Sequence, residues 1–231
     1  MWLPHVGQDN YALVSFSVPV SMNVMAIRFA PSGDFLAIIA SIGHSRNWVP
    51  AALSIWSFLG GDLLRTLPQD SNDTFDKLQA WYTYQDHASL SFSVDKPLLA
   101  SAWSSHVSIW NYESDEIVGE IHGSAPERVA LDSRGRRLAI SYFGDEGVKL
   151  FDVSTIRGNV DLEEHPFVEL DTGDNVIGRQ VSQIVFSPSG DILAVLLEDR
   201  EVELWDAGLG CCLHSGTYRR FRTETWPNFR T

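Results

Sequence analysis

A short phrase of sequence recurs four times in this chain of 231 residues, and it limits what the chain can fold into. The first copy covers residues 27–37 (IRFAPSGDFLA), and the fourth covers residues 184–194 (IVFSPSGDILA). Weaker copies occupy residues 90–100 and 129–139. Each copy joins two apolar runs through a segment of turn-forming residues. Such repetition predicts a stack of equivalent units, none of which can bury its apolar faces alone.

A third apolar run follows each copy and ends in a large aromatic side chain. These four aromatic residues are Trp56, Trp110, Phe151 and Trp205. A turn and a fourth short apolar run follow, so each unit reads as a four-stranded antiparallel meander. The inner runs keep nearly constant lengths, whereas residues 41–52, 68–86 and 153–180 carry insertions. Constant strands with variable connections are typical of a fixed scaffold with surface loops.

Two of the units carry a family resemblance. Residues 186–206 (FSPSGDILAVLLEDREVELWD) resemble the WD-repeat signature, and residues 131–152 (LDSRGRRLAISYFGDEGVKLFD) are similar, with Phe151 in place of Trp. The resemblance extends over residues 22–215 and implies an all-β fold, a β-propeller of four-stranded antiparallel blades. We expect blades at about 22–67, 88–121, 127–170 and 181–215. Residues 1–21 contain a further candidate strand, and residues 216–231 form a tail.

The resemblance also implies a hydrogen-bonded tetrad inside each blade, which this chain carries only in degenerate form. In the third unit His122, Ser141 and Asp145 occupy matching positions, but the Trp is missing. In the fourth unit Asp199 and Trp205 match. We therefore expect these residues and the blade aromatics to be structural, with apolar packing between blades providing most of the stability.

Blade number is a separate matter. WD-repeat propellers close with more blades than the four visible here, so the resemblance implies a partial propeller, the C-terminal part of a larger WD-repeat protein. An open array exposes apolar faces at its two ends. We expect missing blades or self-association to cover them.

Composition excludes some classes of function. The formal net charge of −13 disfavours broad binding of nucleic acid or anionic membranes, which require a cationic face. The two cysteines, Cys211 and Cys212, are adjacent, so a structural disulfide between them is not expected. With no signal-peptide pattern, we expect an intracellular protein of the cytoplasm or nucleus.

The sequence contains no phosphate-binding loop, no nucleophile elbow and no zinc-protease helix motif, and its histidines are scattered. We therefore predict no catalytic residues, no metal, no cofactor and no enzyme activity. The leading hypothesis is a non-catalytic scaffold that binds protein partners through its inserted loops. The loop at 68–86 supplies aromatic residues of the kind enriched at binding hot spots: Phe75, Trp81, Tyr82 and Tyr84.

Two alternatives remain open. The tail carries four arginines and interleaved aromatic residues, which is a pattern used to bind nucleic acid or phosphoinositides. A propeller hydrolase is the other alternative, although the inner-strand candidates Arg28, Ser91 and Gln183 do not make a metal cage.

Overall fold

The computed structural model describes residues 22–42, 49–58, 60–67, 88–103, 106–122, 126–143, 147–155, 158–159, 168–170, 180–198 and 201–217. The chain divides into two compact units, Met1–Asp86 and His87–Thr231. Within the described ranges the elements are strands and one 3-10 turn, η2 (Val153–Thr155). None of the helical structure in those ranges is long and apolar enough to cross a membrane.

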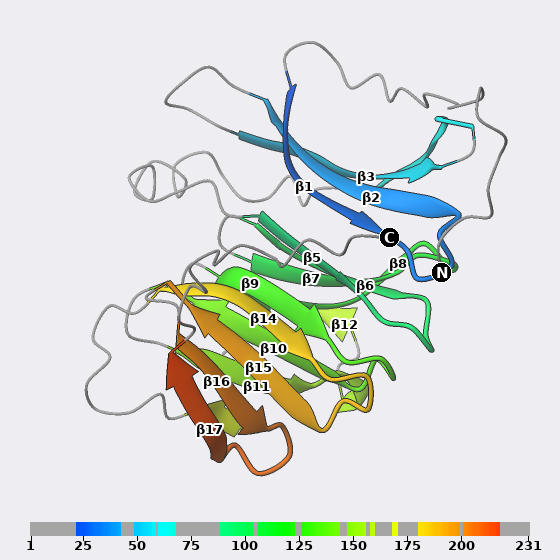
Figure 1. The fold of residues 1–231 in the computed structure, drawn as a ribbon. Coiled ribbons are helices and arrows are strands. Elements are labelled where there is room, and N and C mark those ends of the chain that lie inside the picture. The colour runs from blue at the N-terminus through cyan, green and yellow to red at the C-terminus, as the bar shows by residue number, and fades with distance from the viewer. Residues whose placement is uncertain are drawn as a thin grey trace, which may run out of the picture. The chain divides into compact units, whose positions relative to one another are not determined.

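The first unit contains one four-stranded antiparallel sheet (Figure 1). Its strands lie in sequence order: β1 (Met22–Phe29), β2 (Phe35–Ile42), β3 (Val49–Ser57) and β4 (Leu63–Leu67). Both faces of β2 are buried, because Leu36 and Ile38 point to one face and Ala37 and Ile39 to the other.

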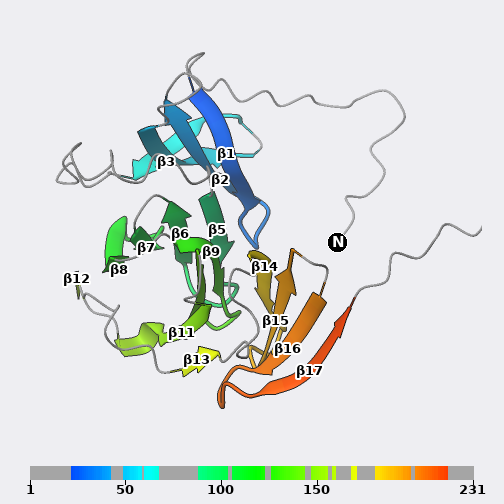
Figure 2. The ribbon, with the colours of Figure 1, turned by 90° about the vertical axis from the view of Figure 1, so that its left-hand side faces the viewer.

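The second unit contains three more sheets of the same design. The second sheet comprises β5 (Ala88–Phe92), β6 (Leu98–Trp103), β7 (His106–Asn111) and β8 (Glu116–His122). The third comprises β9 (Pro126–Leu131), β10 (Arg137–Tyr142), β11 (Val148–Asp152) and β13 (Val168–Leu170). The fourth comprises β14 (Val181–Phe186), β15 (Ile192–Leu197), β16 (Glu201–Asp206) and β17 (Cys212–Thr217). The first strands β5, β9 and β14 lie side by side in the interior of this unit (Figure 2).

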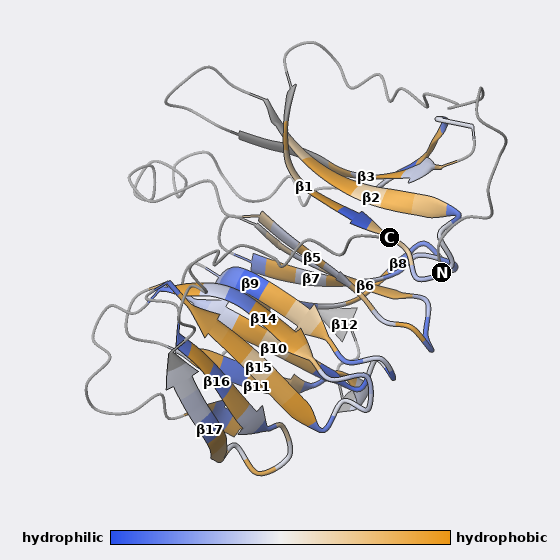
Figure 3. Cartoon of the chain, in the orientation of Figure 1, coloured by the Kyte–Doolittle hydropathy of each residue, from blue (hydrophilic) through white to orange (hydrophobic). Residues whose placement is uncertain are grey.

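These sheets confirm the predicted fold class, an all-β array of four-stranded antiparallel blades. Apolar residues lie along the strands, and polar residues lie in the turns between them (Figure 3). The repeat is also geometrically regular. The third-strand aromatic pairs with a second-strand leucine in every sheet, as Leu36↔Trp56, Leu99↔Trp110, Leu138↔Phe151 and Leu193↔Trp205. The four aromatic residues are thus equivalent in register.

The turn between the first and second strands repeats as well. In three sheets a glycine with positive φ closes it, namely Gly33 (80°), Gly135 (58°) and Gly190 (80°). Each of these glycine N–H groups donates to the carbonyl three residues earlier, at 2.9–3.0 Å. The second sheet has Lys96 at the equivalent position, and there the Lys96 N–H donates to the Ser93 hydroxyl at 3.4 Å. A tight turn can therefore form without glycine when a serine side chain supplies the acceptor.

The residue after each blade aromatic caps the next turn. The side-chain oxygens of Ser57, Asn111, Asp152 and Asp206 all accept hydrogen bonds from backbone N–H groups two or three residues later. For Asp206 the N–H groups of Leu209 and Gly208 lower the pKa of the carboxyl, and the Arg137 guanidinium adds to the effect. This local capping explains why Ser, Asn and Asp are interchangeable at this position.

Adjacent sheets of the second unit interlock in two ways. Apolar faces pack together, so that Leu138 and Phe151 of the third sheet lie against Ala100 and Ile109 of the second. Burying each large side chain of this kind stabilises the fold by about 1.5–3 kcal/mol. The turns also join across the sheets: the Ser93 hydroxyl donates to the Ser133 carbonyl at 2.9 Å.

The same joint recurs one sheet further along. The Ser133 hydroxyl donates to the Pro188 carbonyl at 2.7 Å, and the Arg137 guanidinium donates to the Gly190 carbonyl at 3.1 Å. The matching basic contact of the preceding joint runs from Lys96 Nζ to the Gly135 carbonyl at 3.1 Å. Repeated packing and repeated hydrogen bonds make the three sheets of this unit one interlocked body.

The structure corrects three details of the sequence analysis. Residues 41–42 and 49–52, expected within a loop, continue β2 and β3, so the insertion lengthens a hairpin. Residues 153–180, also expected as a loop, contain η2, β13 and β12 (Gly158–Asn159), and β12 pairs in parallel with β8 at the edge of the second sheet. The last strand continues to Thr217, beyond the expected end of the fourth blade.

Candidate interaction site

A β-bulge occurs at the same position in the first strand of three sheets. The register shifts between Val24 and Ala26 in β1, between Val181 and Gln183 in β14, and at the start of β9. The extra residues are Met25, Ser182 and, in β9, Glu127. A bulge re-aims the side chains next to it, and bulges are frequent beside functional sites. In the second unit the bulges of β9 and β14 bring charged residues together.

Arg128 connects these two bulges. Its Nε donates to the carbonyl of Ser182 at 2.9 Å, which ties the bulge of the third sheet to that of the fourth. Its Nη1 donates to the carbonyl of Glu127 at 3.0 Å. The guanidinium is thus held between two backbone carbonyls.

Glu127 is the most unusual charged residue of this region, because it is almost completely buried. Burial raises the pKa of its carboxyl, the nearby Glu198 carboxylate raises it further, and Arg128 opposes both effects. Glu198 is exposed at the end of β15. The Gln180 amide, oriented with its nitrogen toward this carboxylate, donates to both Glu198 oxygens at 3.0 and 2.9 Å. We call Glu127, Arg128, Gln180, Ser182 and Glu198 the bulge site.

An aromatic residue and a lysine adjoin the bulge site. Tyr142 ends β10, is buried and pairs with Pro126, the residue before Glu127. The ammonium nitrogen of Lys149 lies 5.0 Å from the centroid of the Tyr142 ring, a cation–π arrangement. Tyr142 and Lys149 thus lie beside the strand pair in which Glu127 is the bulge residue.

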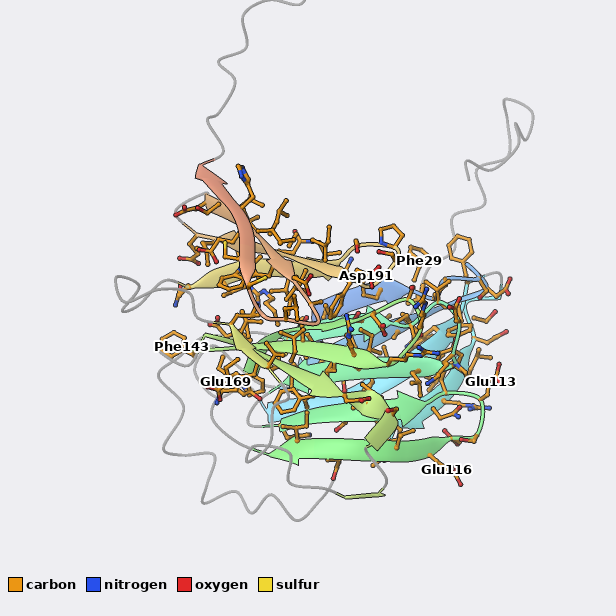
Figure 4. The ribbon with its side chains drawn as sticks, turned by 90° about the horizontal axis from the view of Figure 1, so that it is seen from below. Phe29, Glu113, Glu116, Phe143, Glu169 and Asp191 are labelled. Atoms are coloured by element: carbon orange, nitrogen blue, oxygen red, sulfur yellow. The ribbon has the colours of Figure 1, made fainter. Side chains whose placement is uncertain are left out.

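The bulge site lies at the end of the sheets where β9 and β14 begin and where β10 and β15 end. Strands β10, β13 and β15 end, and strands β11, β14 and β16 begin, at this same end. Figure 4 shows Phe143, which follows β10, at this end, and Glu113 and Glu116 at the opposite end. The opposite end carries the tight turns and also η2 and β12, which lie between β11 and β13.

A buried carboxylate with a raised pKa is common at functional sites, and it attracts a cation or a hydrogen-bond donor. In the part of the chain that the structure describes, no group of three or more His, Cys, Asp or Glu residues could hold a metal ion.

Several residues singled out in the sequence lie outside the described ranges. They are the four loop aromatics Phe75, Trp81, Tyr82 and Tyr84, together with Asp145 and Asp199. His122 is the last residue of β8, and only its backbone is described. The candidate strand at residues 11–18 and residues 218–231 of the basic tail also fall outside, so predictions about them stay predictions.

The structure describes the remaining blade residues, all of which are buried. Trp56 Nε1 donates to the Ser54 hydroxyl at 2.8 Å, and Trp205 Nε1 donates to Glu203 at 3.0 Å. In both cases the acceptor stands two residues earlier on the same strand. Ser141 is completely buried in β10, and its hydroxyl has no hydrogen-bond partner among the described residues.

Sequence reasoning missed the bulge site. In the sequence Glu127 and Arg128 look like solvated charges at the start of an apolar run, because no particular residue type marks a bulge. One signal was available: aligning the units on their first-strand anchors places Glu127 and Ser182 at the same repeat position.

No protein-family model matches the chain, and no curated protein matches it. Solved structures do match. A structure of the Myceliophteria thermophila Cps50 (Swd1) beta-propeller domain is 19% identical, with a TM-score of 0.59, and the match covers 85% of this chain and 55% of that one.

A chain in a structure of the mitotic checkpoint complex is 17% identical, with a TM-score of 0.61, and the match covers 86% of this chain and 52% of that one. Similarity at this identity shows the fold, which is that of a β-propeller. The chain spans about half the length of these two neighbours.

Proposed function

We propose that this chain is a WD-repeat scaffold of the cytoplasm or nucleus that binds a protein partner and catalyses no reaction. The fold supports this class, because interlocked sheets hold a fixed surface at their loop-bearing end. One of the two structural neighbours comes from a multi-protein complex. Fold similarity does not establish function, so the proposal depends on the site.

The observation that carries the proposal is the buried carboxyl of Glu127. Arg128 lowers the pKa of Glu127 and so offsets part of its burial, and Glu198, which is exposed, adds a second negative charge close to Glu127. A lysine or arginine of a partner protein would relieve the repulsion between the two carboxylates. Charge-assisted hydrogen bonds of this kind are stronger than neutral ones. We therefore expect the partner to present a basic segment.

Affinity capture tests the proposal. Tagged wild-type protein and the Glu127→Gln/Glu198→Gln variant are used to capture partners from native lysate, with quantification by mass spectrometry. The matched control is Glu113→Gln, which removes an exposed carboxylate from the opposite end of the sheets. We expect the double variant to lose one specific partner at least tenfold, and the control to retain it.

A second arm separates the bulge site from the loop predicted by sequence. Replacing residues 68–86 with a Gly-Ser turn removes all four candidate aromatic residues. If the loop variant loses the partner and the double variant keeps it, binding depends on the loop and our assignment of the bulge site is wrong. If neither variant changes the set of captured proteins, both surfaces are excluded. Circular dichroism checks that each variant is folded.

A further inference from the structure

The turn between β9 and β10 is the most basic of the turns that the structure describes. Residues 132–137 (DSRGRR) contain three arginines and one aspartate. The equivalent turns of the first and fourth sheets have the sequence PSGD, and the turns within residues 57–62, 111–116 and 206–211 contain aspartate or glutamate but no lysine or arginine. We call residues 132–137 the basic turn. It is distinctive because the whole chain has a formal net charge of −13.

The basic turn lies between the two neighbouring turns of its unit and is bonded to both. The Ser133 carbonyl accepts hydrogen bonds from the N–H groups of Val94 and Asp95, at 3.0 and 2.8 Å. On the other side the Ser133 hydroxyl donates to the Pro188 carbonyl. The basic turn is therefore held in place by the sheet before it and by the sheet after it.

The backbone of the basic turn is also fixed from within. Asp132 is buried, and its Oδ1 accepts hydrogen bonds from the backbone N–H groups of Arg136 at 2.6 Å and Arg137 at 3.1 Å. The one carboxylate of the basic turn is thus engaged by the turn's own backbone. A ligand that meets the arginine side chains finds a base that is already ordered, which reduces the conformational entropy lost on binding.

Four cations surround this base, and two of them are unpaired. Arg134 and Arg136 are exposed, and neither guanidinium makes a hydrogen bond or an ion pair in the part of the chain that the structure describes. Lys96 and Arg137 donate to backbone carbonyls, which carry no net charge, although Arg137 also interacts with the Asp206 carboxyl. The basic turn therefore presents uncompensated positive charge on an acidic chain.

The surroundings of the basic turn limit what can bind there. Val94 is 64% exposed, so an apolar side chain is available beside the turn. Asp95 on the preceding turn and Asp191 on the following turn are both exposed, so the cationic region is one turn wide. A nucleic-acid strand carries a negative charge at every nucleotide and is bound by cations along its length. A short acidic peptide needs only the one turn.

We propose that the basic turn docks an acidic segment of a second protein partner, whose neighbouring carboxylates face Arg134 and Arg136 and whose apolar side chain packs on Val94. Guanidinium and carboxylate groups form charge-assisted hydrogen bonds that are frequently bidentate. The bulge site, with its carboxylates, lies at the other end of the sheets, so the two ends bind segments of opposite charge. The chain can then bridge two partners that do not compete with each other.

Fluorescence anisotropy with a short labelled peptide of Asp, Glu and Leu tests this docking. The assay uses the full chain at about 0.15 M salt, where the Debye length is about 8 Å and distant acidic charges are largely screened. Arg134→Glu and Arg136→Glu should each weaken binding about fivefold, and Val94→Ser should weaken it by a smaller factor. The matched control is Arg28→Glu, which makes the same charge change at an exposed arginine of the first sheet and should bind like the wild type.

The arginine variants should remain folded, which circular dichroism checks, because neither side chain takes part in the hydrogen bonds that hold the basic turn. A wild-type protein that does not bind the peptide would overturn the proposal, as would an equal loss of binding in Arg28→Glu. Tighter binding of a single-stranded RNA, with the same dependence on the arginines, would instead make the basic turn a nucleic-acid site. The Glu127→Gln/Glu198→Gln variant should bind the acidic peptide like the wild type, so this test is separate from that of the bulge site.

Discussion

Replacing Phe151 with tryptophan should destabilise the protein, although tryptophan is the residue that the WD-repeat pattern has at this position. Phe151 is equivalent to Trp56 and Trp205 in register and is almost completely buried. The indole N–H groups of those two residues donate to Ser54 and Glu203, each two residues earlier on the strand. The residue two before Phe151 is Lys149, which has no acceptor atom.

The magnitude has two contributions. A buried N–H group without an acceptor costs about 1–3 kcal/mol. The larger ring must also fit among Leu138, Val129 and Ile109, and overpacking of a core typically costs about 1–3 kcal/mol. We therefore expect Phe151→Trp to lower the free energy of unfolding by about 2–6 kcal/mol. For a domain of this size each kcal/mol lowers Tm by about 2–4 °C.

Thermal unfolding followed by far-UV circular dichroism measures this loss. The second variant, Phe151→Trp/Lys149→Ser, supplies the acceptor that Ser54 supplies in the first sheet, and it should recover about 1 kcal/mol. Lys149→Ser alone provides the baseline, because it removes the contact with Tyr142, worth about 0.5–1 kcal/mol. A Phe151→Trp protein as stable as the wild type would refute the reasoning, as would a double variant with no recovery beyond additivity.

Two further predictions concern the turn at Gly190 and the pH dependence of stability. Gly190→Ala should cost about 2–4 kcal/mol in urea unfolding, because the new Cβ combines φ of +80° with a 3.1 Å approach to Asp132, while Gly216→Ala should cost almost nothing. Asp206 has a lowered pKa in the folded state, so the stabilisation that it provides is present above its unfolded-state pKa and is lost as pH falls through its folded-state pKa. Asp206→Asn should therefore reduce the loss of stability at acid pH. Glu127 has a raised pKa in the folded state, so its effect on stability has the opposite sign. The free energy of unfolding should decline as pH rises through the folded-state pKa of Glu127, and Glu127→Gln should abolish that decline in unfolding curves measured at a series of pH values.

Much of the fold could be predicted from local sequence, because each unit contains its own turn chemistry. The PSGD turns and the apolar runs on either side of them specify a hairpin without reference to the rest of the chain. The aromatic at the end of the third run then fixes the register of the meander. All four aromatics pair with a leucine of the second strand, as a repeat requires.

The bulge site could not be predicted in the same way. Glu127 and Glu198 are 71 positions apart in sequence, and only the packing of the third sheet on the fourth brings them near each other. The burial of Glu127 depends on a bulge, and a bulge is decided by how two strands pair rather than by the residue that it displaces.

The amino-acid sequence by itself determined the strand order, the turn types and the equivalence of the four units, because these depend on residues close together in the chain. Tertiary structure alone decided which faces are covered. Leu150 and Leu204 occupy the same repeat position and are both leucine, yet one is completely buried and the other is partly exposed. Among the described residues the fourth sheet packs on Leu150, and no sheet packs on Leu204. The burial of a side chain depends on what packs against it as much as on the side chain itself.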